Sequence, residues 1–245
     1  MRASVGLMMR GIAPRPQEFP HPDFSEQVKA VIVSACRAAW TDLRTEVATE
    51  GREIGQLSEN DITARLKDLL NQLLVTDPPV VSGFSAAIFQ EIVRDAAVTT
   101  HDGSSLDKKP DLAFRLIARY PGLRLNEYRA LFAECKIIDA RTHPIGLYCE
   151  KGVARYVRGD YAWTMPSALM LGYPRDDSGV DTTLKRALLR GRQRKPDPYQ
   201  TKRLPRAFSR LGDSPVAFVS VHRRKWRYTG RERAGDVHIL HLWLR

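Results

Sequence analysis

Two stretches in the middle of the chain decide the fold: DLAFRL at residues 111–116 and YRALFAECKII at residues 128–138. Apolar residues recur at every second position in both, and this period of two is typical of β-strands. In the second stretch Glu134 and Lys136 share a face, opposite the face of its small and aliphatic residues. Asp111 begins the first stretch on the corresponding polar face. The pattern predicts a hairpin that brings two carboxylates and an ammonium to one face.

Helices are expected before this hairpin, which turns at Tyr120-Pro121-Gly122. Apolar residues recur at three- and four-residue spacing from Ser25 to Glu50. A second helix should begin near Leu57, with Ser58 or Asn60 as its N-cap, and end before Asp77-Pro78-Pro79. The segment Phe89–Val98 fits either a strand or a helix, and the extended segments that follow it favour a strand.

The half of the chain after the hairpin is more basic. Residues 146–159 fit a helix, and residues 167–173 a short apolar strand. Residues 216–221 and 237–243 read as two strands joined by a polar loop. The very basic stretch between residues 184 and 206 is either a disordered tail or a strap for nucleic acid.

Composition favours a polyanion as the partner. Lys and Arg outnumber Asp and Glu by 39 to 28, which gives a net charge of +11. With 43% apolar residues the chain can bury a core as a single domain over residues 23–245, preceded by a flexible, proline-rich tail at residues 1–22. No apolar run approaches the ~20 residues of a membrane-spanning helix, so we expect a cytoplasmic protein that binds no membrane.

Cysteine and histidine supply no metal motif. The three cysteines, Cys36, Cys135 and Cys149, lack Cys-x-x-Cys spacing, which favours reduced thiols over disulfides or zinc. Four histidines invite a metal interpretation, but the two in the last strand point to opposite faces, so we interpret all four as structural. They are His143, His222, His238 and His241.

The hairpin residues suit the hydrolysis of a phosphodiester. This reaction needs a divalent cation to offset developing charge and to acidify the attacking water, and Mg²⁺ takes hard oxygen ligands. Asp111 and Glu134 could supply carboxylates, and the backbone carbonyl of Cys135 a further ligand. Lys136 could hold the water or stabilise negative charge. Charges inside an apolar strand are costly unless they are paired or bound to metal, so their presence needs a reason.

Pro110-Asp111 followed by Glu134-Cys135-Lys136 resembles the PD-(D/E)xK nuclease superfamily, which includes restriction endonucleases. The resemblance covers roughly residues 58–173. It implies an α/β restriction endonuclease-like αβββαβ core with a central mixed sheet flanked by helices, here with an added N-terminal helix and a basic C-terminal extension. It also implies that Asp111, Glu134 and Lys136 are catalytic and that the two acids bind Mg²⁺, for which Mn²⁺ should substitute.

Further roles follow from the same resemblance. An acidic residue of the preceding helix often joins the metal site, which falls on Glu59 or Asp61 here; a helix cap explains Glu59 equally well. The helix after the motif often contacts phosphates, matched by Lys151 and Arg155, with Arg158 on the same helix. The implied function is an endonuclease that acts on DNA in preference to RNA, as a homodimer or in a larger complex, with antiviral defence as a role.

Three alternatives stand beside this interpretation. Glu134 and Lys136 could form an exposed ion pair on a solvent-facing strand. The chain could be a non-catalytic nucleic-acid-binding module, or an interaction subunit whose basic face binds an acidic protein. A second (D/E)xK triplet, Asp107-Lys108-Lys109, lies in a polar stretch and is interpreted as solvated surface.

Overall fold

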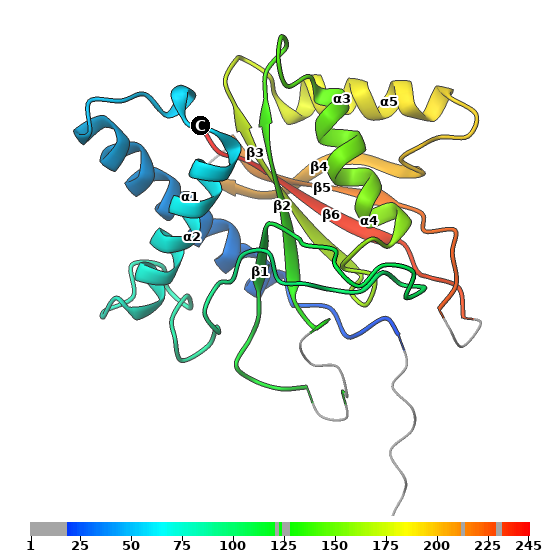
Figure 1. The fold of residues 1–245 in the computed structure, drawn as a ribbon, viewed down its shortest axis with the longest axis horizontal. Coiled ribbons are helices and arrows are strands. Elements are labelled where there is room, and N and C mark those ends of the chain that lie inside the picture. Colours follow the sequence, from blue (N-terminus) through cyan, green and yellow to red (C-terminus); the bar gives the residue numbers. More distant parts are fainter. Residues whose placement is uncertain (1–18, 121–122, 124–127, 212–213, 229–231) are drawn as a thin grey trace, which may run out of the picture.

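The computed structural model describes residues 19–120, 123, 128–211, 214–228 and 232–245. Over these residues, six strands form a mixed sheet between layers of helices (Figure 1). The strands are β1 (Leu112–Phe114), β2 (Leu131–Ile138), β3 (Ser167–Pro174), β4 (Thr201–Leu211), β5 (Ser214–His222) and β6 (Val237–Trp243). Their order is β1-β2-β3-β6-β5-β4, with β2, β3 and β6 parallel and the other pairs antiparallel. The expected α/β class is confirmed.

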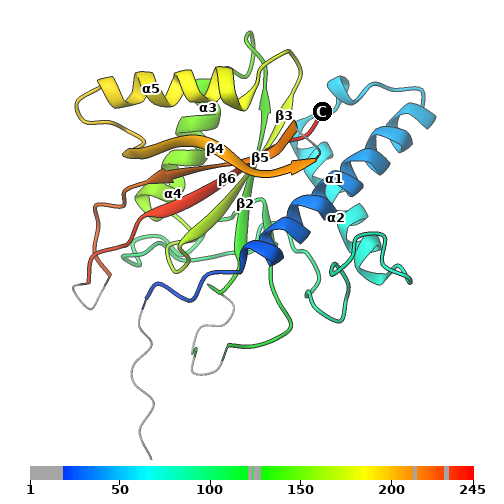
Figure 2. The same ribbon diagram turned by 180° about the vertical axis from the view of Figure 1, so that it is seen from behind.

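Two long helices cover one face of the sheet (Figures 1 and 2). They are α1 (Glu26–Thr49) and α2 (Glu59–Val75), separated by a 3₁₀ turn at Ile54–Gln56. Ser25 caps α1 by accepting a hydrogen bond from the backbone of the first turn, and Ser58 does the same for α2. Both helices therefore begin where the sequence predicts.

Strand β2 separates the two halves of the core. Leu131, Ala133, Cys135 and Ile137 pack with α1 and α2, whereas Phe132 packs with the helices on the opposite face. The alternation expected from the sequence is thus confirmed, and it places the polar positions of β2 on the face away from α1 and α2.

The opposite face carries shorter helices. They are α3 (Ile145–Tyr148), a π-helical turn (Cys149–Val153), α4 (Ala154–Arg158), a second π-helical turn (Val180–Leu184) and α5 (Lys185–Gln193). The first three form one helical segment, as predicted. It ends at Gly159, where φ is +77° and a Cβ atom would lie 2.8 Å from the ring of Trp226. Across the described part of the chain, every helix falls short of the length or apolarity that crossing a bilayer requires.

The prediction of a strand at Phe89–Val98 is wrong. This segment forms only isolated bridges, to residues 108, 113 and 116. The backbone of Ile92 pairs with a side chain instead, because Asn71 of α2 binds both its N–H (2.8 Å) and its carbonyl (3.0 Å). Asp95 then takes a positive φ of 52°, which ends any extended run. Two strands rather than three thus precede α3.

The basic stretch at residues 184–206 is folded, which excludes the disordered tail. It forms α5 and the beginning of β4, an edge strand that the sequence did not predict. Pro205 lies within β4, and proline in a strand is tolerated at a sheet edge. Proline and the many basic side chains conceal this strand from a search for periodicity.

Part of the expected N-terminal tail is packed as well. The N–H of His21 donates to the carbonyl of Thr164 at 2.7 Å, and the His21 side chain is buried. The ring of Phe19 lies 5.0 Å from that of Trp163. Residues 1–18 of the expected tail, and Pro121-Gly122 of the expected turn, lie outside the described residues.

Candidate active site

The candidate site begins where β1 ends beside β2. Strand β1 pairs with β2 only as far as Leu112 opposite Ala133, so the next N–H groups of β2 on this edge lack a strand partner. Carboxylates accept hydrogen bonds from these N–H groups in place of a neighbouring strand. The N–H of Cys135 donates to Asp111 Oδ2 at 2.6 Å, and that of Ile137 donates to Glu59 Oε2 at 2.9 Å. The edge of the sheet therefore fixes two acids side by side.

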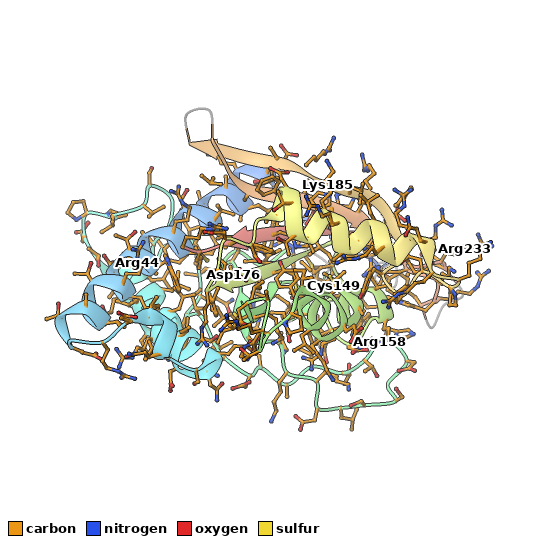
Figure 3. All side chains as sticks on the ribbon, turned by 90° about the horizontal axis from the view of Figure 1, so that it is seen from above. Arg44, Cys149, Arg158, Asp176, Lys185 and Arg233 are labelled. Atoms are coloured by element: carbon orange, nitrogen blue, oxygen red, sulfur yellow. The ribbon has the colours of Figure 1, made fainter. Side chains whose placement is uncertain are left out.

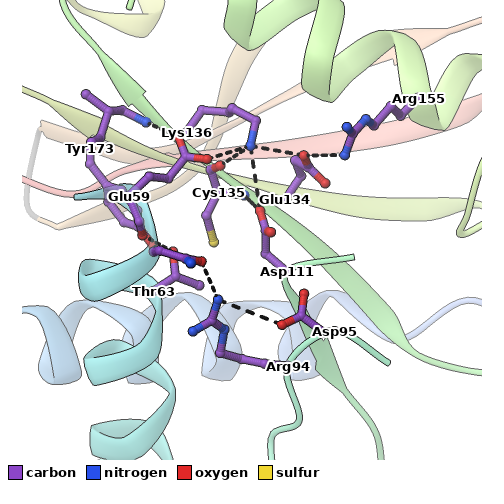
Figure 4. Close-up of polar contacts among 12 residues, drawn as sticks. Glu59, Thr63, Arg94, Asp95, Asp111, Glu134, Cys135, Lys136, Arg155 and Tyr173 are labelled. Carbon is purple, nitrogen blue, oxygen red and sulfur yellow. Dashed lines mark hydrogen bonds and ion pairs between the residues drawn. The ribbon is translucent and has the colours of Figure 1, made fainter. Parts of the chain in front are cut away.

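The ammonium of Lys136 lies at the centre of the site (Figure 4). Four oxygen atoms surround its nitrogen: Cys135 O at 2.6 Å, Glu59 Oε1 at 2.8 Å, Glu134 Oε1 at 3.1 Å and Asp111 Oδ2 at 3.8 Å. Burial by itself would lower the pKa of Lys136, but attraction to Glu134 and Asp111 outweighs it and raises that pKa above its ordinary value. Lys136 is therefore held as a cation.

Glu134 is the most deeply buried acid of the site, with 1% of its side chain exposed. Arg155 of α4 donates to Oε1 at 2.8 Å, and the hydroxyl of Tyr161 donates to Oε2. Burial, followed by repulsion from Asp111, raises the pKa of Glu134 to about 7. Burial also raises the pKa of Asp111, although the nearby Lys136 partly opposes this shift. An exposed Glu134–Lys136 pair is therefore excluded.

Tyr161 is a site residue that sequence reasoning missed. It follows α4, and the next residue, Ala162, adopts a positive φ of 54°, a conformation that costs of order 1 kcal/mol in a residue other than glycine. The buried guanidinium of Arg224 donates to the carbonyls of Trp163 and Met165, both at 3.2 Å, and fixes this turn. A lone tyrosine after a helix carries no signal of this role.

As expected, the side chain of Cys135 lies in the core and its backbone carbonyl lies at the site. Its side chain is fully buried in the core beside Thr63 and Tyr173, whose hydroxyls lie 3.3 Å apart, and burial raises the pKa of its thiol. Its backbone carbonyl points to the Lys136 ammonium (Figure 4). Only the carbonyl is thus available to the site.

Other candidate residues lie apart from this cluster. Asp61 accepts hydrogen bonds from Ser58 in a capping box, so of the two acids at the start of α2 it is Glu59 that reaches the site. Lys151 and Arg158 of the helical segment are exposed, and Arg158 pairs with Asp160 at 2.9 Å. Their contact with phosphate stays a prediction. Lys109 pairs with Asp107 at 3.3 Å on the surface, as expected.

The donor set fits a hard divalent cation. Three carboxylates and one carbonyl face a single point, and two cations, Lys136 and Arg155, form ion pairs with these acids in the described part of the chain. Mg²⁺ commonly binds through one or two carboxylates together with waters. Within the described residues, no three His, Cys, Asp or Glu side chains are gathered tightly enough to enclose a metal by themselves. In this site the Lys136 ammonium lies among the acids.

Comparison of the chain with protein-family models, with curated proteins and with solved structures gave no match. Function therefore has to be inferred from the chemistry of this cluster and from the fold that assembles it.

Proposed function

We propose that this chain is a Mg²⁺-dependent endonuclease with a core of the PD-(D/E)xK, restriction endonuclease-like kind, acting on DNA in preference to RNA. The observation that carries the proposal is the convergence of Glu59, Asp111, Glu134 and the Cys135 carbonyl on one cationic centre. A cluster in which carboxylates exceed cations is costly to bury, and a bound cation would offset that cost.

Each residue has a role in this proposal. Asp111 and Glu134 would hold the metal, with the Cys135 carbonyl and Glu59 completing its surroundings. A bound Mg²⁺ would offset charge on the phosphate and lower the pKa of the attacking water. Lys136 donates a hydrogen bond to that water or to a phosphate oxygen. Arg155, whose side chain is 35% exposed, can reach a phosphate while it orients Glu134.

The arrangement of elements supports the resemblance in part. Helix α2, the β1–β2 hairpin, the α3–α4 segment and the parallel strand β3 follow in the implied order. Asp111 immediately precedes β1, and Glu134 lies on β2. One strand of the implied αβββαβ series is replaced by the bridged segment before β1. The proposed core thus retains the site-bearing strands.

Cleavage tests the proposal directly. Purified protein is incubated with plasmid, linear duplex DNA and single-stranded RNA in Mg²⁺, Mn²⁺ or EDTA, beside Lys136→Ala. The matched control is Lys67→Ala, which removes a lysine paired with Asp68 on α2, away from the site. We expect cleavage of DNA by the wild type and Lys67→Ala with either metal, and none in EDTA or by Lys136→Ala. Equal cleavage by both variants would overturn the assignment of Lys136.

Thermal stability gives a readout independent of catalysis. Lys136→Ala leaves the oxygen cluster without its internal cation, so Mn²⁺ should raise the Tm of this variant by several degrees more than that of the wild type. A purely structural ion cluster predicts that Mn²⁺ leaves both Tm values unchanged. Duplex binding without cleavage or a metal effect would favour the non-catalytic binding module.

A further inference from the structure

Most of the net charge of the chain is concentrated in one short stretch. Residues 185–206 contain nine basic side chains and one acidic one, so 22 of 245 residues account for eight of the eleven net positive charges. The basic residues are Lys185, Arg186, Arg190, Arg192, Arg194, Lys195, Lys202, Arg203 and Arg206. We call these nine residues the basic surface. All nine are exposed.

Helix α5 holds part of this surface in a fixed orientation. Ala187 and Leu188 are buried in the core that α5 shares with α3 and α4. Gly191 lies against Tyr199 so closely that a Cβ atom would come within 2.5 Å of its ring. Arg186, Arg190 and Arg192 therefore project outward from a well-packed helix.

Few acidic groups neutralise the positive charge of the basic surface. Its single acid, Asp197, accepts backbone hydrogen bonds from Tyr199 and Thr201, both within 3 Å, in the turn before β4. Among the described residues, Lys202 is the one member that forms an ion pair, with Asp236 at 2.6 Å. The other eight cations face solvent without an acidic partner among the described residues, and their clustered charge attracts a polyanion.

The opposite layer of helices differs in charge. Helices α1 and α2 together carry five basic and six acidic residues. Their charges are partly paired, as between Lys67 and Asp68 at 2.6 Å. Figure 3 shows Arg44 of α1 and Lys185 of α5 on opposite sides of the sheet. The excess of positive charge is thus concentrated on and beside α5, whereas α1 and α2 carry none.

The face of the sheet that α5 covers is also the one that carries the candidate active site. Phe132, which shares its face of β2 with Glu134 and Lys136, is buried in the same cluster as α4 and α5. Arg155 of α4 contacts Glu134 directly, and the exposed Lys151 adds positive charge on the same helical segment. A polyanion lying across α4 and α5 would therefore pass beside the site.

We propose that the basic surface binds the phosphate backbone of duplex DNA, outside the catalytic cluster. The inference rests on the proposed nucleic-acid function. A nine-residue helix is about 13 Å long, and a duplex carries one charge per ~1.7 Å, so α5 faces several phosphates at once. A membrane-surface helix needs a broad apolar face, but α5 exposes Leu189 alone among its large apolar residues.

Salt dependence of binding tests this assignment. Binding of a short labelled duplex to the full chain is measured in EDTA, over a range of salt, for the wild type and for Arg186→Gln/Arg190→Gln/Arg192→Gln. The control, Arg37→Gln/Arg44→Gln/Arg52→Gln, removes the same charge on the opposite side. The α5 triple variant should bind roughly tenfold or more weakly, and its slope of log affinity against log salt should fall by about 0.9 for each phosphate that the variant no longer neutralises. The control slope should equal that of the wild type.

Each other outcome has a definite meaning. Equal slopes for both triple variants would overturn the inference, as would tighter binding to duplex RNA, to anionic vesicles or to polyglutamate than to duplex DNA. Failure of the proposed function is distinguishable, because binding is measured in EDTA and cleavage is measured separately with Mg²⁺. If the basic surface binds DNA but the wild type never cleaves it, the inference stands and the nuclease proposal fails.

Discussion

Two polar networks on the same face of the sheet differ in charge and in what they can do. The first is the ionic cluster around Lys136, at the partly exposed edge where β1 ends. The second is a buried neutral chain that links α3, β6 and β5. It runs from the Tyr148 hydroxyl to His241 Nδ1 (2.9 Å), from His241 Nε2 to Ser220 Oγ (2.7 Å), from Ser220 Oγ to His222 Nε2 (2.7 Å) and from His222 Nδ1 to the Tyr199 carbonyl (2.7 Å).

The protons of the neutral chain follow from its partners. His222 Nδ1 must donate to the Tyr199 carbonyl, so its Nε2 accepts from Ser220. Ser220 Oγ then accepts from His241 Nε2, and His241 Nδ1 accepts from Tyr148. Burial lowers the pKa of both histidines, to about 4 for His222, so both are neutral. These two histidines are structural, as the sequence predicts.

The difference explains why one network is proposed as a site and the other is not. Each nitrogen in the neutral chain has one partner and no charge, so a ligand would have to break a satisfied bond. In the ionic cluster three carboxylates share two cations, and Glu134 titrates near neutrality. A further cation would relieve this crowding. Four experiments, in order of decreasing effect, probe that contrast.

Removing the charge of Glu134 should abolish function but not folding. In Glu134→Gln the amide keeps the shape of the side chain and can still pair with Arg155 and Tyr161, but it is a poorer ligand for a cation. We expect DNA cleavage to fall about 10³-fold, equivalent to about 4 kcal/mol in the barrier. The unfolding free energy in urea should change by less than ~1 kcal/mol. Unchanged cleavage would place the reaction elsewhere.

Interrupting the neutral chain should lower the folding stability but leave cleavage unchanged. Ser220→Ala leaves His222 Nε2 and His241 Nε2 without a partner in the core. We expect the unfolding free energy in urea to fall by about 3 kcal/mol, with cleavage per folded molecule unchanged. The control, Ser34→Ala, alters an exposed position of α1 and should stay close to the wild type. Loss of cleavage at full stability in Ser220→Ala would show that the two networks are coupled.

Lowering the pH should reduce the folding stability of the protein, because His222 takes up a proton more readily in the unfolded chain. Its folded pKa is about 4, against 6.5 as the ordinary value, so the unfolded chain takes up the proton first as the pH falls. The stability is complete above pH 6.5 and decreases from there towards pH 4, by about 3 kcal/mol for this group. Urea unfolding at pH 7 and pH 4.5 measures the loss. His222→Gln should show a smaller difference between the two pH values; an equal difference would assign the loss to other groups.

The smallest effect is expected at Tyr161, a positioning residue for Glu134. Tyr161→Phe removes a hydrogen bond that lowers the pKa of Glu134, so cleavage should decrease about tenfold and its acidic limb should move to higher pH. Tyr228→Phe is the matched control, since its hydroxyl donates to the Trp163 carbonyl outside the site. A uniform decrease in rate with no shift of the pH profile would indicate a merely structural role.

Elements that local geometry controls could be predicted from the sequence alone. Alternation placed Glu134 and Lys136 on one face of β2, and three- and four-residue spacing defined α1 and α2, with Ser58 or Asn60 expected as the cap of α2. The same logic failed where side chains replaced backbone partners. Asn71 binds the backbone of Ile92, so the apolar segment around it is no strand, and β4 forms at an edge in spite of Pro205.

Which groups meet in the site was settled only by the packing of the whole chain. Glu59 lies 77 residues before Lys136 in the chain, and nothing local distinguished it from Asp61 as the acid that reaches the site. Tyr161 likewise reaches Glu134 from the turn after α4, whose carbonyls accept hydrogen bonds from the distant Arg224. Side-chain periodicity is set by neighbouring backbone angles and is therefore legible in the sequence. The approach of distant groups depends on how helices pack on the sheet, which is set by the entire core.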